Sequence, residues 1–175
     1  MNEIIKKNGI LFGVITGILG ALITTLIYVI NLELFISMWV GLTSLLLYII
    51  IGVVLLTKTK KELKGILSFK DAFTTYFISA VIGILISVAF NIILFNLIDP
   101  AVKETLKELT IKYMTETMQK FNSPPSAIND AMKKLQENDP YSVIELIKGT
   151  VFKIAFGALF GLLLALVFKS NTTQE

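Results

Sequence analysis

The sequence predicts an all-α integral membrane protein with four transmembrane helices and an outer amphipathic helical segment between the third and the fourth. Three observations predict this class. Of the 175 residues, 54% are hydrophobic and 17% are charged, whereas soluble domains average about 45–50% apolar and about 25% charged residues. The mean hydropathy is +0.76. The apolar residues are also gathered into uncharged blocks that are long enough to cross a bilayer.

The first two spans come from one long apolar block, residues 9–57, whose single charge is Glu33. One helix of that length would extend about 73 Å, more than twice the hydrocarbon thickness of about 30 Å. We therefore expect the chain to turn back near Asn31–Glu33, with transmembrane helices over 9–32 and 34–57. Each would be about 36 Å long and would cross the bilayer with some tilt.

The third span follows a lysine-rich loop that begins at Lys58. Ser68 and Asp71 fit the pattern of a capping box, in which side chains cover the free N–H groups of a new helix. The next charge-free block, 72–98, ends at Asp99–Pro100, and proline disfavours helical geometry in the residue before it. We expect a transmembrane helix over 72–98.

Residues 99–148 form the one sizeable polar region, with seven lysines and eight acidic residues. Apolar side chains recur at helical spacing over 101–121, which predicts an amphipathic helix. Ser126 is a suitable cap for a second, shorter helix that ends near Pro140. We expect both helices to lie on the bilayer surface or to cap the bundle.

The fourth span is predicted over 149–168 and is interrupted only by Lys153. A charged side chain within a transmembrane segment is a candidate functional residue. The candidate partners in the same half of the membrane are Asn91, Asn96 and Glu33. The alternative is that the long Lys153 side chain extends its ammonium group to the headgroups. The four spans form one membrane domain over 1–175.

The distribution of lysine indicates how the chain is oriented. The two ends and the 58–71 loop together hold eight lysines and four acidic residues. In residues 99–148, by contrast, the seven lysines are outnumbered by eight acidic residues. Lysine is enriched in short cytoplasmic segments next to the membrane. We therefore expect both termini to be cytoplasmic and the region 99–148 to be extracytoplasmic.

The residue types that are missing exclude several kinds of chemistry. The sequence contains no His and no Cys, and all 16 basic residues are Lys. The usual zinc, haem and thiol sites therefore cannot form. We expect no metal, no cofactor and no catalytic residue, although Asp, Glu, Lys, Ser and Tyr remain available for catalysis. The net charge of +3 follows from lysine-rich loops, and we expect no nucleic-acid partner.

Small residues recur every fourth position within the spans. This spacing places them on one helix face, where small side chains let two helices approach closely in lipid. We expect these faces to pack within the chain or between two copies of it, and a small-residue pore lining is the alternative. The residues are Gly9, Gly13, Gly17, Ala21, Ser79, Gly83, Ser87, Gly157, Gly161 and Ala165.

Several of these features together resemble one bacterial membrane family. They are the entry Ser68-Phe69-Lys70-Asp71-Ala72-Phe73, the exit Asp99-Pro100, the Met- and Lys-rich outer segment, and a glycine-rich last span that ends in Lys169. The chain resembles the family catalogued as domain of unknown function 4199 over nearly its whole length. The resemblance implies a four-span protein of the bacterial inner membrane and transfers no catalytic residue.

We expect a non-enzymatic accessory or scaffold protein whose outer helices contact lipid or a partner. The partner would be the lipid bilayer, a second copy of the chain or another membrane protein. The alternative function is a small oligomeric transporter or channel that uses the glycine-faced helices, Lys153 and Asn91. A membrane enzyme acting on lipid is a third class, and the sequence offers no clustered acid–base pair for it.

Overall fold

The computed structural model describes residues 2–137 and 139–170. Within these ranges the chain forms six α-helices, and a short 3-10 helix η1 and a short π-helix η2 interrupt or extend them. The predicted fold class is confirmed, because four of the helices are long and apolar enough to cross a membrane. The elements are α1 Glu3–Ile30, η1 Leu32–Ile36, α2 Met38–Glu62, α3 Phe69–Ile93, η2 Leu94–Ile98, α4 Val102–Lys120, α5 Pro125–Glu137 and α6 Val143–Phe168.

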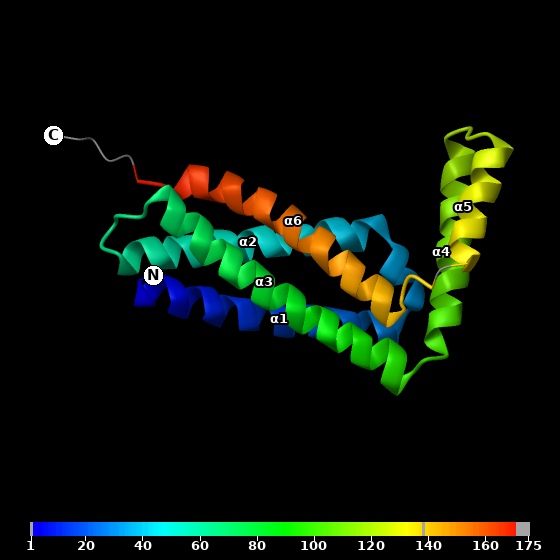
Figure 1. Ribbon diagram of the computed structural model, residues 1–175, viewed down its shortest axis with the longest axis horizontal. Coiled ribbons are helices and arrows are strands. Elements are labelled where there is room, and N and C mark those ends of the chain that lie inside the picture. The colour runs from blue at the N-terminus through cyan, green and yellow to red at the C-terminus, as the bar shows by residue number, and fades with distance from the viewer. Residues whose placement is uncertain (1, 138, 171–175) are drawn as a thin grey trace.

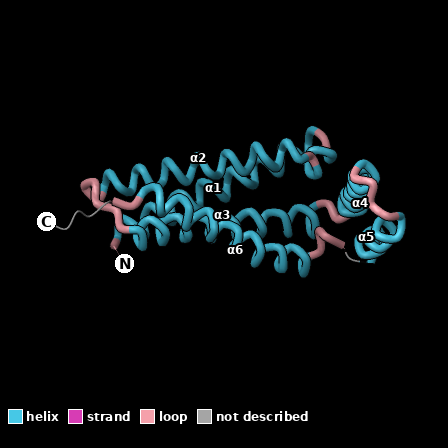
Figure 2. The backbone as a smooth tube through the Cα atoms, turned by 90° about the horizontal axis from the view of Figure 1, so that it is seen from above, coloured by secondary structure: helices cyan, strands magenta, loops and turns pink. Residues whose placement is uncertain are grey.

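The four long helices α1, α2, α3 and α6 lie side by side in an elongated bundle (Figure 1). The start of α1, the loop between α2 and α3, and the end of α6 lie at one end of the bundle. At the other end, α4 and α5 form a helical hairpin, here called the arm, that stands across the bundle axis (Figures 1 and 2). The cores at the two ends of the bundle are built from different side chains.

The core near the chain ends is a small apolar cluster that joins α2, α3 and α6. Its members are Leu56, Leu67, Ala72 and Ala165. The core next to the arm joins η2 to the first turns of α4. Its members are Leu94, Phe95, Val102 and Leu106. Phe95 also makes edge-to-face contacts with the rings of Phe35 and Tyr141, at centroid distances of 5.6 Å and 5.4 Å. These contacts seat α4 on the end of the bundle.

Several helices extend beyond the apolar blocks that we predicted as spans. The α1 helix begins at Glu3, where the Asn2 side chain accepts a hydrogen bond from the Ile4 N–H. The α6 helix begins at Val143, where the Ser142 side chain accepts from the Glu145 N–H. A charge can end a membrane span without ending a helix, because a helix can continue into water. The helices therefore mark the spans only approximately.

Three local expectations are wrong in detail. The turn that we placed near Asn31–Glu33 is the longer element η1, so the second long helix begins at Met38. The residues from Lys58 to Glu62, expected in a loop, continue α2. The second outer helix begins at Pro125, one residue before the Ser126 that we expected to cap it, and proline suits a first helical turn because its missing N–H needs no partner there.

The predicted start of α3 is confirmed. The Ser68 hydroxyl accepts a hydrogen bond from the Asp71 N–H at 3.1 Å and donates one to the Asp71 carboxylate at 2.7 Å. One free N–H of the new helix is thus satisfied by a side chain, and the acidic group lies near the positive end of the helix dipole.

The residues at the end of α6 and just after it are tied to the loop between α2 and α3. The loop turns at Gly65, whose φ of +87° lies in the left-handed region that glycine adopts without strain. The Ser170 hydroxyl donates to the Gly65 carbonyl at 2.9 Å and accepts from the Leu67 N–H at 3.0 Å. The Lys60 ammonium donates to the Phe168 carbonyl at 3.1 Å. This end of the bundle is therefore held by backbone groups as well as by packing.

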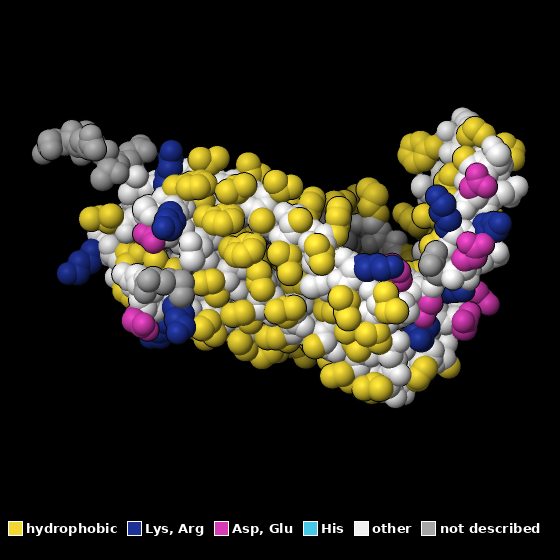
Figure 3. Space-filling model, in the orientation of Figure 1, with side chains coloured by type: hydrophobic (Ala, Val, Ile, Leu, Met, Phe, Trp, Pro, Cys, Tyr) yellow, Lys and Arg dark blue, Asp and Glu magenta, His cyan; other side chains and the backbone are white. Residues whose placement is uncertain are grey.

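The surface of the bundle suits a lipid environment. Hydrophobic side chains cover the visible side of the bundle, and charged side chains gather toward its two ends and on the arm (Figure 3). Large apolar residues such as Trp39 and Val29 are 76% and 72% exposed. A water-soluble protein rarely exposes so continuous an apolar surface. The four apolar helices therefore indicate a multi-pass membrane protein.

Candidate functional site

The most extensive helix contact in the bundle joins α1 to α3. A Cβ atom added at Gly9, Gly13 or Gly17 would lie 2.9 Å, 2.7 Å or 2.6 Å from an isoleucine Cβ atom on α3. The three isoleucines follow one another at the same four-residue spacing as the glycines, and they are Ile78, Ile82 and Ile86. The absence of a side chain on α1 therefore sets the distance between these two helices.

The other small residues that we singled out lie in different surroundings. Gly83 lies against Thr16 of α1, and Gly161 lies against the Tyr76 ring, where an added Cβ would be 2.8 Å away. Ala165 is fully buried in the cluster near the chain ends, and Ala21 is half-buried. Gly157 is less crowded, because an added Cβ would have its nearest neighbour, Ala80, at 3.7 Å. Small residues on α6 therefore border both a tight contact and an open space.

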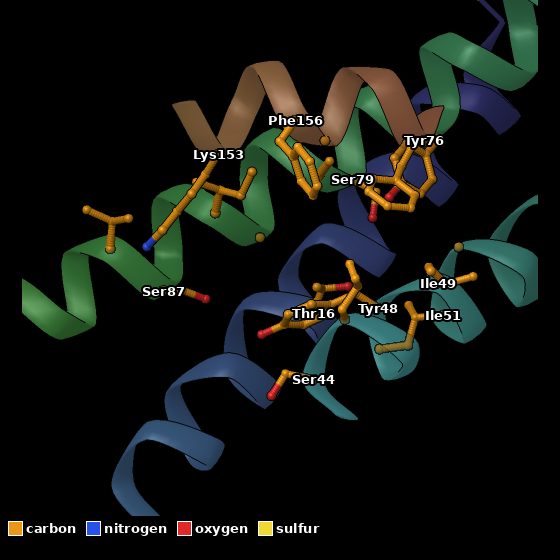
Figure 4. A pocket seen from close by; sticks show the side chains of 18 of the residues that line it. Thr16, Ser44, Tyr48, Ile49, Ile51, Tyr76, Ser79, Ser87, Lys153 and Phe156 are labelled. Carbon is orange, nitrogen blue, oxygen red and sulfur yellow. The ribbon is translucent and has the colours of Figure 1, made fainter. Parts of the chain in front are cut away.

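That open space is a cavity of about 350 Å³ between α1, α2, α3 and α6. Aliphatic and aromatic side chains make up most of its wall, and six hydroxyl-bearing residues also line it. These are Thr16, Ser44, Tyr48, Tyr76, Ser79 and Ser87 (Figure 4). A volume of this size falls within the range of about 300–1,000 Å³ that is typical of small-molecule sites, and a mostly apolar wall with a few polar groups is typical of them too.

The Tyr76 ring narrows the cavity toward the chain-terminal end of the bundle. A Cβ added at Gly52 of α2 would lie 2.7 Å from this ring, and one added at Gly161 of α6 would lie 2.8 Å from it. Two helices thus omit a side chain where the ring passes between them. Gly52 does not belong to any of the four-residue series that we recognised, so sequence spacing alone did not find it.

Lys153 lies on α6 and lines the cavity, with its side chain directed toward the part of α3 that carries Ser87 (Figure 4). Within the described part of the chain, its ammonium group makes neither a hydrogen bond nor an ion pair, and no acidic residue lines the cavity. It follows Lys148 by five residues, which places it about 7.5 Å farther along the helix. A lysine near the centre of a membrane costs about 2.5–3.5 kcal/mol on insertion scales. The cavity thus carries an uncompensated positive charge.

The three side chains considered as partners for Lys153 are placed as follows. Asn96 donates to the Tyr141 carbonyl at 3.2 Å and accepts from the Lys103 ammonium at 3.2 Å. The Asn91 side-chain oxygen is buried and has no hydrogen-bond partner within the described residues. Glu33 is exposed in η1. The structure records no bond from any of the three to Lys153.

Two polar clusters at the ends of the bundle were not found from the sequence. Next to the arm, the Lys103 ammonium lies 3.3 Å from the Asp139 carboxylate, and the Tyr28 hydroxyl donates to the Asp99 carboxylate at 2.8 Å. At the other end, the buried Asn8 amide donates to the Thr59 hydroxyl at 3.2 Å and to the Glu62 carboxylate at 2.8 Å. Each cluster joins segments that are far apart in the sequence.

Tyr141, beside the first of these clusters, lies between α5 and α6. Burial raises the pKa of its phenol above the ordinary value of 10.0. The side chain is therefore neutral near physiological pH and contacts the Phe95 ring as an apolar group. Among the described residues, no group of three or more acidic side chains is placed to hold a metal ion.

Comparison with known proteins gives one match. The family model described as a protein of unknown function, DUF4199, matches residues 11–170. No curated protein and no solved structure matches the chain. The match includes α1 from Leu11 onward, all of α2, α3 and α6, the arm, and every residue of the cavity.

Proposed function

Because this chain belongs to the DUF4199 family, whose function is unknown, we propose its role from its own geometry: a non-enzymatic accessory or scaffold protein that contacts a membrane partner through its outer arm. Four apolar helices would hold the protein in the bilayer. The non-enzymatic part of the proposal rests on the sequence, which contains neither His nor Cys and offers no clustered acid–base pair.

The observation that carries the proposal is a groove of about 600 Å³ between the arm and the turn that joins α1 to α2. Trp39 and Met38 on one wall are 76% and 62% exposed, and Lys112, Tyr113 and Glu116 of α4 form the other wall. Exposed aromatic and methionine side chains with charges of both signs around them are typical of protein interfaces. A segment of a partner protein would fit here.

The groove is preformed, because the arm is fixed to the bundle. Lys103 of α4 contacts both Asn96 of η2 and Asp139. Lys107 of α4 donates to the Gln136 carbonyl of α5 at 2.8 Å, which holds the two helices of the arm together. A preformed surface loses less conformational entropy when a partner binds. In Figure 3 the side of the arm that faces back along the bundle carries hydrophobic side chains, and most of its charges lie elsewhere, which favours an arm that lies along the membrane surface.

Photocrosslinking in native membranes tests the proposal. A photoreactive amino acid in place of Lys112 lies in the groove, and the matched control replaces Lys133, an exposed lysine of α5 outside it. We expect one defined membrane protein to be crosslinked from position 112 and not from position 133. Equal crosslinking from both positions, or none from position 112, would contradict the proposal.

We extend the proposal to location and orientation: a bacterial inner membrane, with both chain ends cytoplasmic and the arm outside. The lysine excess at the two ends and in the 58–71 loop supports it. The sequence has no Cys, so single-cysteine variants can be labelled without background. Asn2→Cys and Ser170→Cys should be protected from an impermeant maleimide in intact cells, and Lys133→Cys should be labelled. Labelling of position 2 together with protection of position 133 would reverse the orientation.

A small oligomeric transporter or channel is the second candidate, and the cavity beside Lys153 favours it. A flux assay in proteoliposomes separates the two functions. Solute or ion flux that depends on the protein and changes in Lys153→Met would support transport. Flux equal to that of protein-free liposomes would leave the accessory role as the better proposal.

A further inference from the structure

The intramembrane cavity has the shape of a chain-binding site. On α3 its lining extends from Tyr76 to Val88, a rise of about 18 Å along the helix. Its volume of about 350 Å³ is at the small end of the range for ligand sites. A long and narrow space of this kind suits one hydrocarbon chain better than the two chains of a phospholipid.

The two ends of the cavity differ in charge. Toward the chain ends, carbon atoms of the Tyr76 ring lie close to Gly52 and Gly161 and narrow the space. Toward the arm lie Lys153 and Ser87 (Figure 4). The Ser87 hydroxyl lies beside Gly20 of α1, and a Cβ atom added at Gly20 would overlap this hydroxyl. The Tyr48 hydroxyl would lie 3.2 Å from the added Cβ atom. A cation thus lies at one end of the space, whereas hydroxyl groups line it along its length.

Lys153 is also open to a ligand from the membrane. Its side chain lines the cavity and is also exposed at the surface of the bundle. A molecule dissolved in the lipid can therefore reach it from the side. No described residue neutralises its charge, and the lining contains no Asp or Glu. In a medium of low dielectric constant an unpaired ammonium group strongly favours an anionic partner.

From these three observations we propose that the cavity binds a long-chain fatty acid, with its carboxylate on the Lys153 ammonium and its chain directed toward Tyr76. The Ser87 and Tyr48 hydroxyls are placed to donate hydrogen bonds at the same end of the cavity. This site is separate from the proposed partner groove, which lies between the arm and the turn that joins α1 to α2. The two proposals are therefore independent. It is a binding proposal and includes no chemical step.

Equilibrium binding to the full chain in phosphatidylcholine nanodiscs tests it, with palmitate as the probe and hexadecanol as the neutral probe of the same chain. We expect palmitate to bind more tightly than hexadecanol, and Lys153→Met to weaken palmitate binding by about tenfold or more, because a charge-assisted hydrogen bond is lost. Hexadecanol binding should not change in this variant. The matched control is Lys148→Met, which removes a lysine from the same helix outside the cavity and should leave both probes unaffected.

A second pair of variants keeps the test decisive if Lys153→Met fails to fold. Gly157→Leu places a side chain in the cavity, where the nearest atoms to an added Cβ are 3.7 Å and 3.8 Å away, and should abolish palmitate binding. Gly149→Leu lies on the same helix with no neighbour within 4 Å of an added Cβ, and it should bind normally.

Three results would overturn the proposal. Equal affinity for palmitate and hexadecanol would remove the role of Lys153. Unchanged palmitate binding in Gly157→Leu would place the ligand outside the cavity. Phosphatidylglycerol and palmitate can be compared as competitors for bound palmitate. If phosphatidylglycerol displaces it at the lower concentration, the site binds an anionic phospholipid instead of a fatty acid.

Discussion

Replacing Gly13 by alanine tests the packing of the bundle most directly. The new Cβ atom would lie 2.7 Å from the Ile82 Cβ and 2.9 Å from the Ser79 carbonyl oxygen. The Ile82 Cβ is attached directly to the α3 backbone, and the Ser79 oxygen is part of that backbone, so neither atom can rotate away. The variant therefore has to move α1 away from α3 along the whole contact.

The expected magnitude follows from a comparison with Gly149→Ala. An added Cβ at Gly149 meets no atom within 4 Å. Both substitutions gain up to about 1 kcal/mol of helix propensity, which cancels in the difference between them. The remaining difference is the cost of overpacking, about 1–3 kcal/mol. We expect Gly13→Ala to be less stable than Gly149→Ala by that amount.

The free energy of unfolding can be measured by titration with sodium dodecyl sulfate in mixed micelles, followed by the fluorescence of Trp39, the one tryptophan. Gly13→Ala should unfold at a lower detergent fraction than both the wild type and Gly149→Ala. If the two alanine variants unfold at the same fraction, the α1–α3 contact does not depend on the missing side chain, and the argument from the added Cβ distances fails.

Three further predictions concern the polar groups. Lys103→Met removes the cation beside Asp139 and should speed limited proteolysis within the arm, at a cost of about 1 kcal/mol for a partly exposed pair; unchanged cleavage would contradict this. Asn8→Leu leaves the Glu62 carboxylate without its buried donor and should lower the unfolding free energy by about 1–3 kcal/mol, measured by the same titration. Burial raises the pKa of Tyr141 in the fold, so the stabilisation by its neutral phenol is complete below about pH 10 and is lost as the pH rises through the folded pKa; Tyr141→Phe should therefore lose less stability than the wild type on alkaline titration.

The membrane class and the number of long helices could be predicted because the bilayer imposes a length on apolar blocks. The ends of the helices could not, since α2 continues through Lys58 to Glu62 and α6 begins before its apolar block. Where a span ends is decided by charge. Where a helix ends is decided by capping and by tertiary contacts.

The candidate site could be predicted only in part. The position of Lys153 inside a span follows from the sequence, but the direction of its side chain depends on how α6 is rotated against α3. Gly52 and Gly20 were missed because their neighbours, Tyr76 and Ser87, come from other helices. Contacts of this kind depend on crossing geometry, which a four-residue spacing within one helix does not determine.

The tight pairing of α1 with α3 has a consequence for biosynthesis. The glycine face of α1 leaves the ribosome two helices before the isoleucines that cover it, and α2, the next helix made, packs against α1 much less extensively. A nascent chain with two inserted helices therefore presents an uncovered groove to lipid or to the insertion machinery. The α1–α3 contact cannot form until the third hydrophobic segment has been made. A pause in translation before residue 69 would therefore prolong the two-helix intermediate in which the glycine face of α1 is uncovered.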